Sequence, residues 1–218
     1  MEKELIKEEG FSYIEKGEGR PIIILHGLMG GLSNFQGVFE HFPLNNYKVI
    51  IPELPVDSTP ILKTNVATFS KFVKAFIDFK NLKDVILLGN SLGGHVGLLF
   101  TRDYPELVSG LIITGSSGLY EKSLIGDGYP KRGNYEYIQN KTEEVFYDPK
   151  IATKEIVDEV FAGVNDREKL FKTLYRGADQ QNLDMIQFKN PTLTVLITVS
   201  WMHRYSRLRE INRQPIPV

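Results

Sequence analysis

The chain has 218 residues, of which 42% are hydrophobic and 24% charged, so it can bury a core as one globular domain with an insertion. With 26 Lys and Arg against 27 Asp and Glu, the net charge is −1, and we expect neither a nucleic-acid nor a membrane partner. The absence of cysteine excludes disulfides, thiolate catalysis and cysteine metal sites. A charged N-terminus without an apolar stretch predicts a cytoplasmic protein.

Strands and helices are expected to alternate through the first half of the chain. Strands are expected at 5–9, 11–16, 22–25, 47–51, 85–88 and 111–114, and helices at about 33–42, 65–79 and 94–104. The run at 22–25 is continuously β-branched or apolar, as in a strand covered on both faces. This alternation predicts a doubly wound, mostly parallel α/β sheet, in which ligands bind at the carboxyl ends of the strands.

The pattern Gly89-x-Ser91-x-Gly93 stands between an apolar run and a helix-like segment. Strand, sharp turn and helix are the context of a nucleophile elbow, which exposes a serine hydroxyl at the tip of a strained turn. Side chains at Gly89 and Gly93 would collide with the neighbouring strand and helix. The N–H of Leu92 and the positive end of the helix would point at the same place. The alternative is a plain glycine-rich turn.

The pattern changes after Gly115. Amphipathic helices are expected at 142–147, 153–164 and 166–176, and the sheet resumes at 192–199. We therefore divide the chain into an N-terminal core at 1–115, a helical cap insertion at 116–185, and a core strand with an atypical tail at 186–218. Tyrosines in the cap either line an apolar pocket or pack against one another; they are Tyr120, Tyr129, Tyr135, Tyr137 and Tyr147.

Three stretches resemble the α/β-hydrolase family, namely 22–30, 89–94 and Tyr104-Pro105-Glu106. The capped members that they resemble are esterases and hydrolases that cleave carbon–carbon bonds in ring-fission products. The resemblance implies that the backbone N–H groups of Leu28 and Leu92 form an oxyanion hole, worth on the order of 3 kcal/mol for each donor. It also implies a substrate site lined by His26, Gly27 and Asn90, with His26 shaping the oxyanion loop.

The C-terminal part departs from the family pattern. After the strand at 192–199 the family has a Gly-x-x-Asp turn with the triad acid, then a strand, a loop with the catalytic histidine and a last helix. Here the sequence runs into Ser200-Trp201-Met202-His203, and that last strand and helix have no visible counterpart. One hypothesis is a tail written out of frame, because a one-base shift at 201–204 permits Gly-Cys-Thr-Asp. Sequencing the coding DNA tests it.

Ser91 needs a general base, and the chain has four histidines. His203 is the base candidate, because the chain order Ser…Asp/Glu…His places the histidine in the C-terminal part. His26 is expected to be structural, His41 to lie at the surface or to be half-buried, and His95 to pack on the elbow helix. The acidic residues Asp179 and Asp184 precede the last strand and are expected to be solvated.

Two hypotheses follow. The first is a serine hydrolase acting on a small ester or related carbonyl substrate through Ser91, with weak or no turnover because a triad acid and histidine are not visible. The second is a non-catalytic domain that binds a small apolar ligand between sheet and cap. No cofactor or metal is expected, since the chain has neither a P-loop nor a metal-ligand cluster. A sheet edge without its last strand predicts self-association.

Overall fold

A computed structural model of the chain describes residues 4–28, 35–60, 63–118, 133–144, 148–166 and 194–198. Its strands form one sheet in the order β1-β2-β4-β3-β5-β6-β7. The strands are β1 (Ile6–Glu8), β2 (Phe11–Lys16), β3 (Arg20–Leu25), β4 (Tyr47–Pro52), β5 (Val85–Asn90), β6 (Val108–Thr114) and β7 (Thr194–Thr198).

The sheet is parallel from β4 to β7 and antiparallel only where β2 joins β1 and β4. The register pairs Leu25 with Gly89 and Asn90 with Thr114. The carboxyl ends of β3, β5 and β6 therefore lie side by side at one edge of the sheet. This arrangement confirms the predicted doubly wound α/β class.

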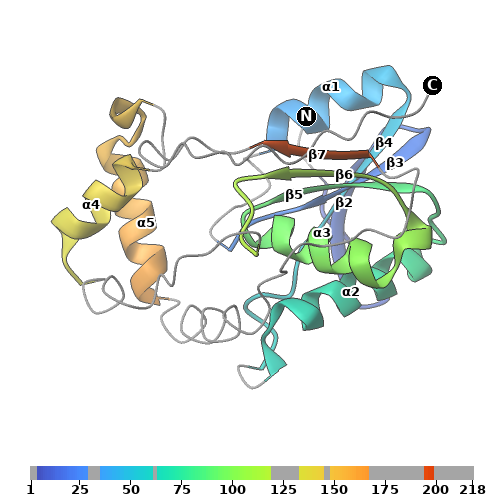
Figure 1. Cartoon of the computed structure of the whole chain (residues 1–218), viewed down its shortest axis with the longest axis horizontal. Helices are drawn as coiled ribbons and strands as arrows, with labels where there is room; N and C mark the ends of the chain where they lie inside the picture. The colour runs from blue at the N-terminus through green and yellow to red at the C-terminus, as the bar shows by residue number, and fades with distance from the viewer. Residues whose placement is uncertain are drawn as a thin grey trace, which may run out of the picture.

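Helices cover both faces of the sheet (Figure 1). The helices α2 and α3 lie on one face and α1 on the other. The described helices are α1 (Gln36–His41), α2 (Val66–Phe79), α3 (Leu92–Asp103), α4 (Tyr135–Glu143) and α5 (Lys154–Asp166), with short 3-10 turns at η2 (Phe42–Asn45), η4 (Pro105–Leu107) and η6 (Pro149–Ile151).

The two core layers explain the apolar run in β3. Successive side chains of a strand point to opposite faces, so Ile23 and Leu25 pack into the cluster beneath α2 and α3, while Ile22 and Ile24 pack into the cluster beneath α1. All four side chains are almost completely buried. A strand covered on both faces has no position left for a polar residue.

The helix expected at 65–79 is confirmed as α2. Asn65 caps it, since its side-chain oxygen accepts a hydrogen bond of 2.8 Å from the backbone N–H of Thr68. The apolar residues at helical spacing are buried as predicted; they are Val66, Phe69, Val73, Phe76 and Ile77. The β1 and β2 strands, with Gly10 between them, are also confirmed.

Helix α4 differs from its prediction. A helix was expected to begin at Thr142, whereas α4 spans Tyr135–Glu143 and begins at the cap Asn134, which accepts a hydrogen bond from the N–H of Tyr137 at 2.9 Å. Only Ile138 and Thr142 are buried, so the sequence shows little helical periodicity. The helix expected at 153–164 is confirmed as α5, and the one expected at 166–176 lies outside the described residues.

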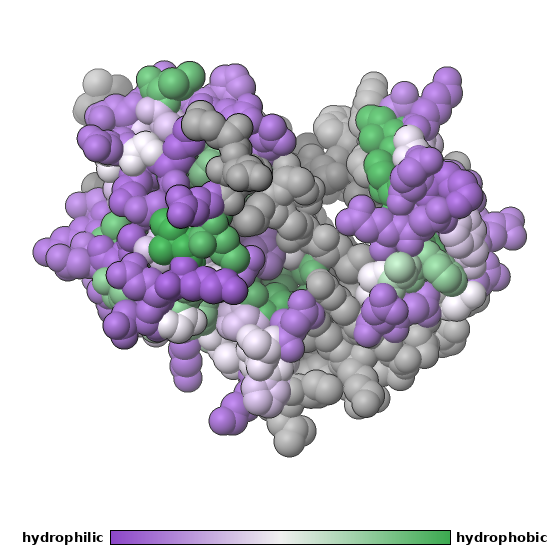
Figure 2. Space-filling model, turned by 180° about the vertical axis from the view of Figure 1, so that it is seen from behind, coloured by the Kyte–Doolittle hydropathy of each residue, from purple (hydrophilic) through white to green (hydrophobic). Residues whose placement is uncertain are grey.

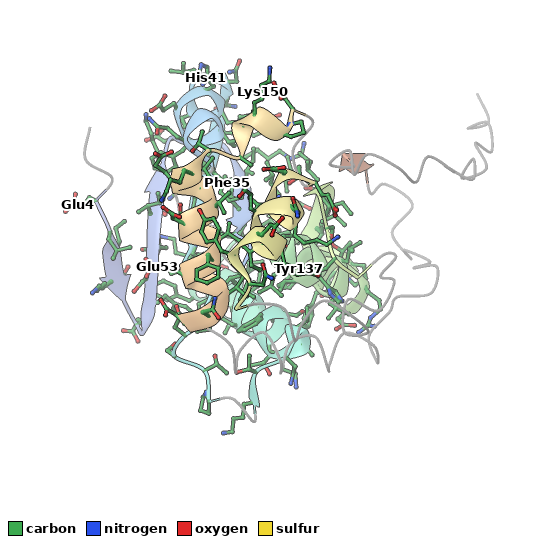
Figure 3. The ribbon with its side chains drawn as sticks, turned by 90° about the vertical axis from the view of Figure 1, so that its left-hand side faces the viewer. Glu4, Phe35, His41, Glu53, Tyr137 and Lys150 are labelled. Atoms are coloured by element: carbon green, nitrogen blue, oxygen red, sulfur yellow. The ribbon has the colours of Figure 1, made fainter. Side chains whose placement is uncertain are left out.

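The α4–α5 pair lies beyond the carboxyl ends of the parallel strands (Figures 1 and 3). Figure 3 looks at the sheet from that side and shows α4 and α5 in front of the strands. The cap insertion expected at 116–185 stays a prediction, because much of that segment lies outside the described residues.

On the face that Figure 2 shows, the described surface is mostly hydrophilic. The large apolar side chains that are exposed on it are Leu5, Leu44 and Ile151. No helix in the described part of the chain is long and apolar enough to cross a membrane. Among the described strands β7 forms one edge of the sheet, and the predicted self-association there stays a prediction.

Candidate active site

Ser91 occupies the tip of the turn between β5 and α3, and its side chain is exposed. Its backbone has φ 52° and ψ −117°, a combination that costs a non-glycine residue about 1–3 kcal/mol. The strand, strained turn and helix predicted from Gly89-x-Ser91-x-Gly93 are all present. Helix α3 begins at Leu92, directly after the serine, rather than at Gly94.

The glycines on either side of Ser91 are required by close backbone approach. A Cβ atom on Gly93 would overlap the carbonyl oxygen of Leu25 at the end of β3 and lie 2.7 Å from that of His26. A Cβ atom on Gly89 would lie 2.6 Å from the Cα atom of Gly94. Both distances are far below van der Waals contact, so the predicted collisions are confirmed.

The loop after β3 lies against the elbow. A Cβ atom on Gly27 would be 3.3 Å from Cβ of Ser91 and 3.3 Å from Oδ1 of Asn90. Leu28 follows Gly27 directly and packs against the core cluster beneath α2 and α3. The loop that carries Gly27 and Leu28 therefore lies against the turn that carries Asn90 and Ser91, and the oxyanion role of the Leu28 and Leu92 N–H groups stays a prediction.

His26 braces two loops at this edge. Its Nδ1–H donates to the carbonyl oxygen of Gly27 at 2.9 Å, and its Nε2 accepts the backbone N–H of Leu54 at 3.0 Å. Leu54 lies just beyond the end of β4. The imidazole thus holds the loop after β3 against the loop after β4, in agreement with the structural role expected for His26, and a contact of its side chain with substrate stays a prediction.

Asn90 joins the elbow to the next strand. Its Nδ2 donates to the carbonyl oxygen and to Oγ1 of Thr114, both at 3.0 Å. The backbone N–H of Ser91 also donates to the carbonyl oxygen of Thr114, at 3.1 Å. Because these bonds anchor the peptide group of Ser91, the end of β6 is part of the candidate site.

Two other histidines, His41 and His95, make contacts elsewhere. Nδ1 of His41 donates to the carbonyl oxygen of Gly37 at 2.8 Å, at the exposed surface of α1. His95 is 1% exposed, and its Nδ1 lies 3.4 Å from Oγ of Ser117. The remaining candidates His203, Asp179 and Asp184 lie outside the described residues.

Sequence reasoning missed Thr114 and Ser117. Both contact Ser91 from the end of β6 and the turn that follows it. The signal in the sequence is the small-residue turn Gly115-Ser116-Ser117-Gly118, which comes at the carboxyl end of a strand expected beside the elbow strand. Among the described residues, no group of three or more His, Asp or Glu side chains could hold a metal ion.

Comparison with known proteins gives the family. Residues 20–207 match the family model described as the alpha/beta hydrolase fold, so the chain belongs to the α/β-hydrolase family of enzymes. An alpha/beta hydrolase enzyme from a sediment metagenome of the Mar Chica lagoon in Morocco is 46% identical, with a TM-score of 0.67, and the match covers 89% of this chain and 74% of that chain.

Several curated relatives are named as hydrolases of 2-hydroxy-6-oxo dienoates or related compounds. The 2-hydroxy-6-oxo-6-phenylhexa-2,4-dienoate hydrolase of Burkholderia cepacia is 31% identical over 126 residues, which are 52% of this chain and 44% of that protein. The matched part of the chain thus spans less than half of that relative. A meta-cleavage product hydrolase structure from Pseudomonas fluorescens has a TM-score of 0.66 at 18% identity, covers 90% of this chain and 78% of that chain, and supports the fold alone.

Proposed function

We propose that the protein is a serine hydrolase that acts on a small ester or related carbonyl compound, with Ser91 as the nucleophile. The observation that carries the proposal is an exposed hydroxyl on a strained turn, with the Gly27 loop packed against it. Strain of this kind persists where the surrounding structure holds it, and it clusters at functional sites.

The proposed reaction follows the usual course of acyl transfer. The Ser91 oxygen attacks the substrate carbonyl carbon while a general base takes the hydroxyl proton. The negative charge that develops on the carbonyl oxygen is stabilised by the backbone N–H groups of Leu28 and Leu92. Collapse of the tetrahedral intermediate expels the leaving group, which takes the proton from the base, and water then hydrolyses the acyl-enzyme.

For the base we propose His203. The ring nitrogens of His26 are both engaged in the brace between two loops, and His41 bonds to its own helix. His95 is enclosed beneath the loop after β6. Chain order supports the remaining histidine, because the base follows the nucleophile in this family.

A narrower substrate class is favoured by the relatives' names. Several of the curated relatives are hydrolases of 2-hydroxy-6-oxo dienoates, at 31 to 32% identity. We propose these ring-fission products as a second candidate substrate class beside simple esters. Both require the same nucleophile and oxyanion donors, so the two classes differ in the leaving group, which is a carbon atom in one and an oxygen atom in the other.

The test is covalent labelling with a fluorophosphonate probe. We expect the wild-type protein to react and the adduct to map to Ser91 by peptide mass spectrometry, and Ser91→Ala to remain unlabelled. Ser109→Ala is a matched control, because the Ser109 hydroxyl donates to the carbonyl oxygen of Asp84 at 2.6 Å at the opposite end of β6. It should label like the wild type.

Each other outcome has a defined meaning. Labelling that persists in Ser91→Ala would rule out the proposed nucleophile. A folded wild-type protein that never labels would favour the non-catalytic, ligand-binding alternative. Labelling that is unchanged in His203→Ala would remove His203 as the base. Turnover of p-nitrophenyl esters and of 2-hydroxy-6-oxo-6-phenylhexa-2,4-dienoate distinguishes the substrate classes, and the weak turnover expected from the sequence is measured in the same assay.

A further inference from the structure

The carbonyl oxygen of Ser91 is surrounded by hydrogen-bond donors. It accepts the backbone N–H of His95 at 3.2 Å, which is the first helical bond of α3. It also lies 3.3 Å from the backbone nitrogen and 3.5 Å from Oγ of Ser117, which both donate to it from the turn after β6. The last two bonds are not part of any helix or strand, so they need another explanation.

The peptide bond connects that carbonyl group to the proposed oxyanion hole. The C=O of Ser91 and the N–H of Leu92 belong to one planar, trans peptide unit, in which they point in opposite directions. Whatever fixes the direction of the Ser91 carbonyl therefore fixes the direction of the Leu92 N–H. We propose that Ser117 is a positioning residue that aims the Leu92 N–H at the substrate oxygen, an inference that rests on the proposed function for its catalytic meaning.

The turn that carries Ser117 is held tightly against the elbow. A Cβ atom on Gly94 would lie 2.5 Å from Oγ of Ser116, and one on Gly118 would lie 2.5 Å from Cδ2 of His95. The hydroxyl of Ser116 donates to the carbonyl oxygen of Ser117 at 2.7 Å. With glycine on both sides of the contact, the turn approaches α3 closely enough for Ser117 to reach the Ser91 carbonyl.

His95 extends the arrangement. Its Nδ1 lies 3.4 Å from Oγ of Ser117, and the ring is enclosed. With the proton on Nδ1, the imidazole donates to Oγ, and the hydroxyl proton is then directed to the Ser91 carbonyl. Hydrogen bonds in such a chain polarise one another, and a polarised carbonyl makes the N–H of its own peptide unit a stronger donor.

The experiment compares Ser117→Ala with Ser117→Thr and Ser109→Ala. Ser117→Ala removes the hydroxyl and keeps the backbone N–H, Ser117→Thr keeps both, and Ser109→Ala removes a serine-to-backbone bond far from the elbow. We expect the fluorophosphonate labelling rate to fall about tenfold in Ser117→Ala, because a less well directed Leu92 N–H loses part of the roughly 10²–10³-fold effect of one oxyanion donor, and to recover in Ser117→Thr. In a turnover assay the loss should appear in kcat rather than in KM.

A second readout does not depend on activity. The ¹³C chemical shift of the Ser91 carbonyl responds to hydrogen bonds that this oxygen accepts, so it should move upfield in Ser117→Ala and stay in place in Ser109→Ala. An unchanged labelling rate in Ser117→Ala, or an equal loss in Ser109→Ala, overturns the inference. If the wild type does not label, the proposed function fails, and an unmoved Ser91 carbonyl shift in Ser117→Ala then overturns the positioning role separately.

Discussion

Helices α3 and α5 have nearly equal lengths and bury very different shares of their residues. Ten residues of α3 are buried, from Leu92 to Thr101, whereas α5 buries Val157 alone. Helix α3 is enclosed between the sheet, α2 and the turn after β6, while α5 packs mainly on α4. The comparison shows that the elbow and α3 are surrounded by packed elements, so a substitution that adds even one atom there should lower the stability of the whole core. Among the described residues the α4–α5 pair is held by few contacts, and changes there should remain local.

The largest effect is expected at Gly93. In Gly93→Ala the new Cβ atom would overlap the carbonyl oxygen of Leu25, and neither the start of α3 nor the end of β3 can retreat from a buried position. We expect a loss of more than about 4 kcal/mol in the free energy of unfolding, or no soluble folded protein, because overpacking against backbone has no rotamer that relieves it. Thermal and urea unfolding followed by circular dichroism measure it.

The matched control is Gly37→Ala. Gly37 lies in α1 on the exposed face, and a Cβ atom there would have no neighbour within 4 Å. The same substitution should therefore stabilise the protein by about 0.5–1 kcal/mol through helix propensity. A folded Gly93→Ala with unfolding like that of the wild type would show that the elbow is not the tightly packed region described above.

The same contrast explains how far the sequence could predict this fold. The elbow was predictable because steric contacts require glycine at fixed positions, and α2 was predictable because its buried face imposes a helical period. Helix α4 was predicted too far along the chain. Only Ile138 and Thr142 are buried in it, so its sequence shows almost no helical repeat of apolar residues. Its remaining local signal is the capping residue Asn134.

The site was predictable to the same extent. Ser91 was placed at a strained elbow by a local motif, which the structure shares, whereas the donor roles of Leu28 and Leu92 come from a family resemblance and stay a proposal. The contributions of Thr114 and Ser117 depend on the pairing of β5 with β6, which sets Asn90 opposite Thr114. A sequence pattern describes one segment at a time and carries no information on how two strands pair. Contacts between the ends of β5 and β6 could therefore not be predicted.

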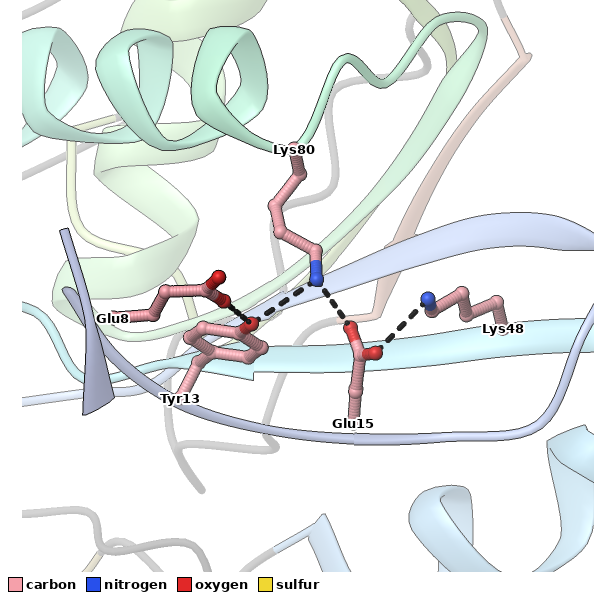
Figure 4. A network of polar contacts seen from close by, with 5 residues as sticks. All are labelled: Glu8, Tyr13, Glu15, Lys48 and Lys80. Atoms are coloured by element: carbon pink, nitrogen blue, oxygen red, sulfur yellow. Dashed lines mark hydrogen bonds and ion pairs between the residues drawn. The ribbon is translucent and has the colours of Figure 1, made fainter. Parts of the chain in front are cut away.

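An intermediate effect on stability is expected at a charged network that links strands β1, β2 and β4 to the end of α2 (Figure 4). Glu15 on β2 lies 3.0 Å from Nζ of Lys80, at the end of α2, and 3.0 Å from Nζ of Lys48 on β4. Nζ of Lys80 also donates to the Tyr13 hydroxyl at 3.1 Å, and that hydroxyl donates to Glu8 at 3.0 Å. The network joins α2 to three strands.

This network makes the stability of the fold depend on pH. Burial works to raise the pKa of Glu15, but hydrogen bonds and charges from Lys80 and Lys48 outweigh it and hold the pKa below 4.5. The folded state therefore favours the carboxylate, so its contribution is present above about pH 4.5 and is lost as pH falls through the lowered pKa. Glu15→Gln should unfold with a flatter pH dependence below that value, measured by urea titration at several pH values.

The control for this pH effect is Asp158→Asn in the α4–α5 pair. The pKa of Asp158 is also lowered, by hydrogen bonds from Lys154 and then Tyr135, but these groups lie at the surface, where water and salt screen the interaction. Its effect on the pH dependence of unfolding should be smaller than that of Glu15→Gln. An equal effect of the two substitutions would contradict the contrast between the core and the α4–α5 pair.

The smallest effect is expected at Tyr135, which joins α4 to α5. Its hydroxyl donates to Oδ1 of Asp158 at 2.6 Å, and its ring lies 5.4 Å from that of Phe161. Tyr135→Phe keeps the ring contact and removes one hydrogen bond, which costs about 1 kcal/mol or less. Because few other contacts within the described part of the chain hold this pair, we expect amide hydrogen exchange to accelerate in α4 and α5 while global unfolding is unchanged. Gln139→Ala, which removes only an exposed contact with Glu143 on α4, should leave both measurements unchanged. A lower stability of the whole protein in Tyr135→Phe would mean that the two helices unfold together with the core.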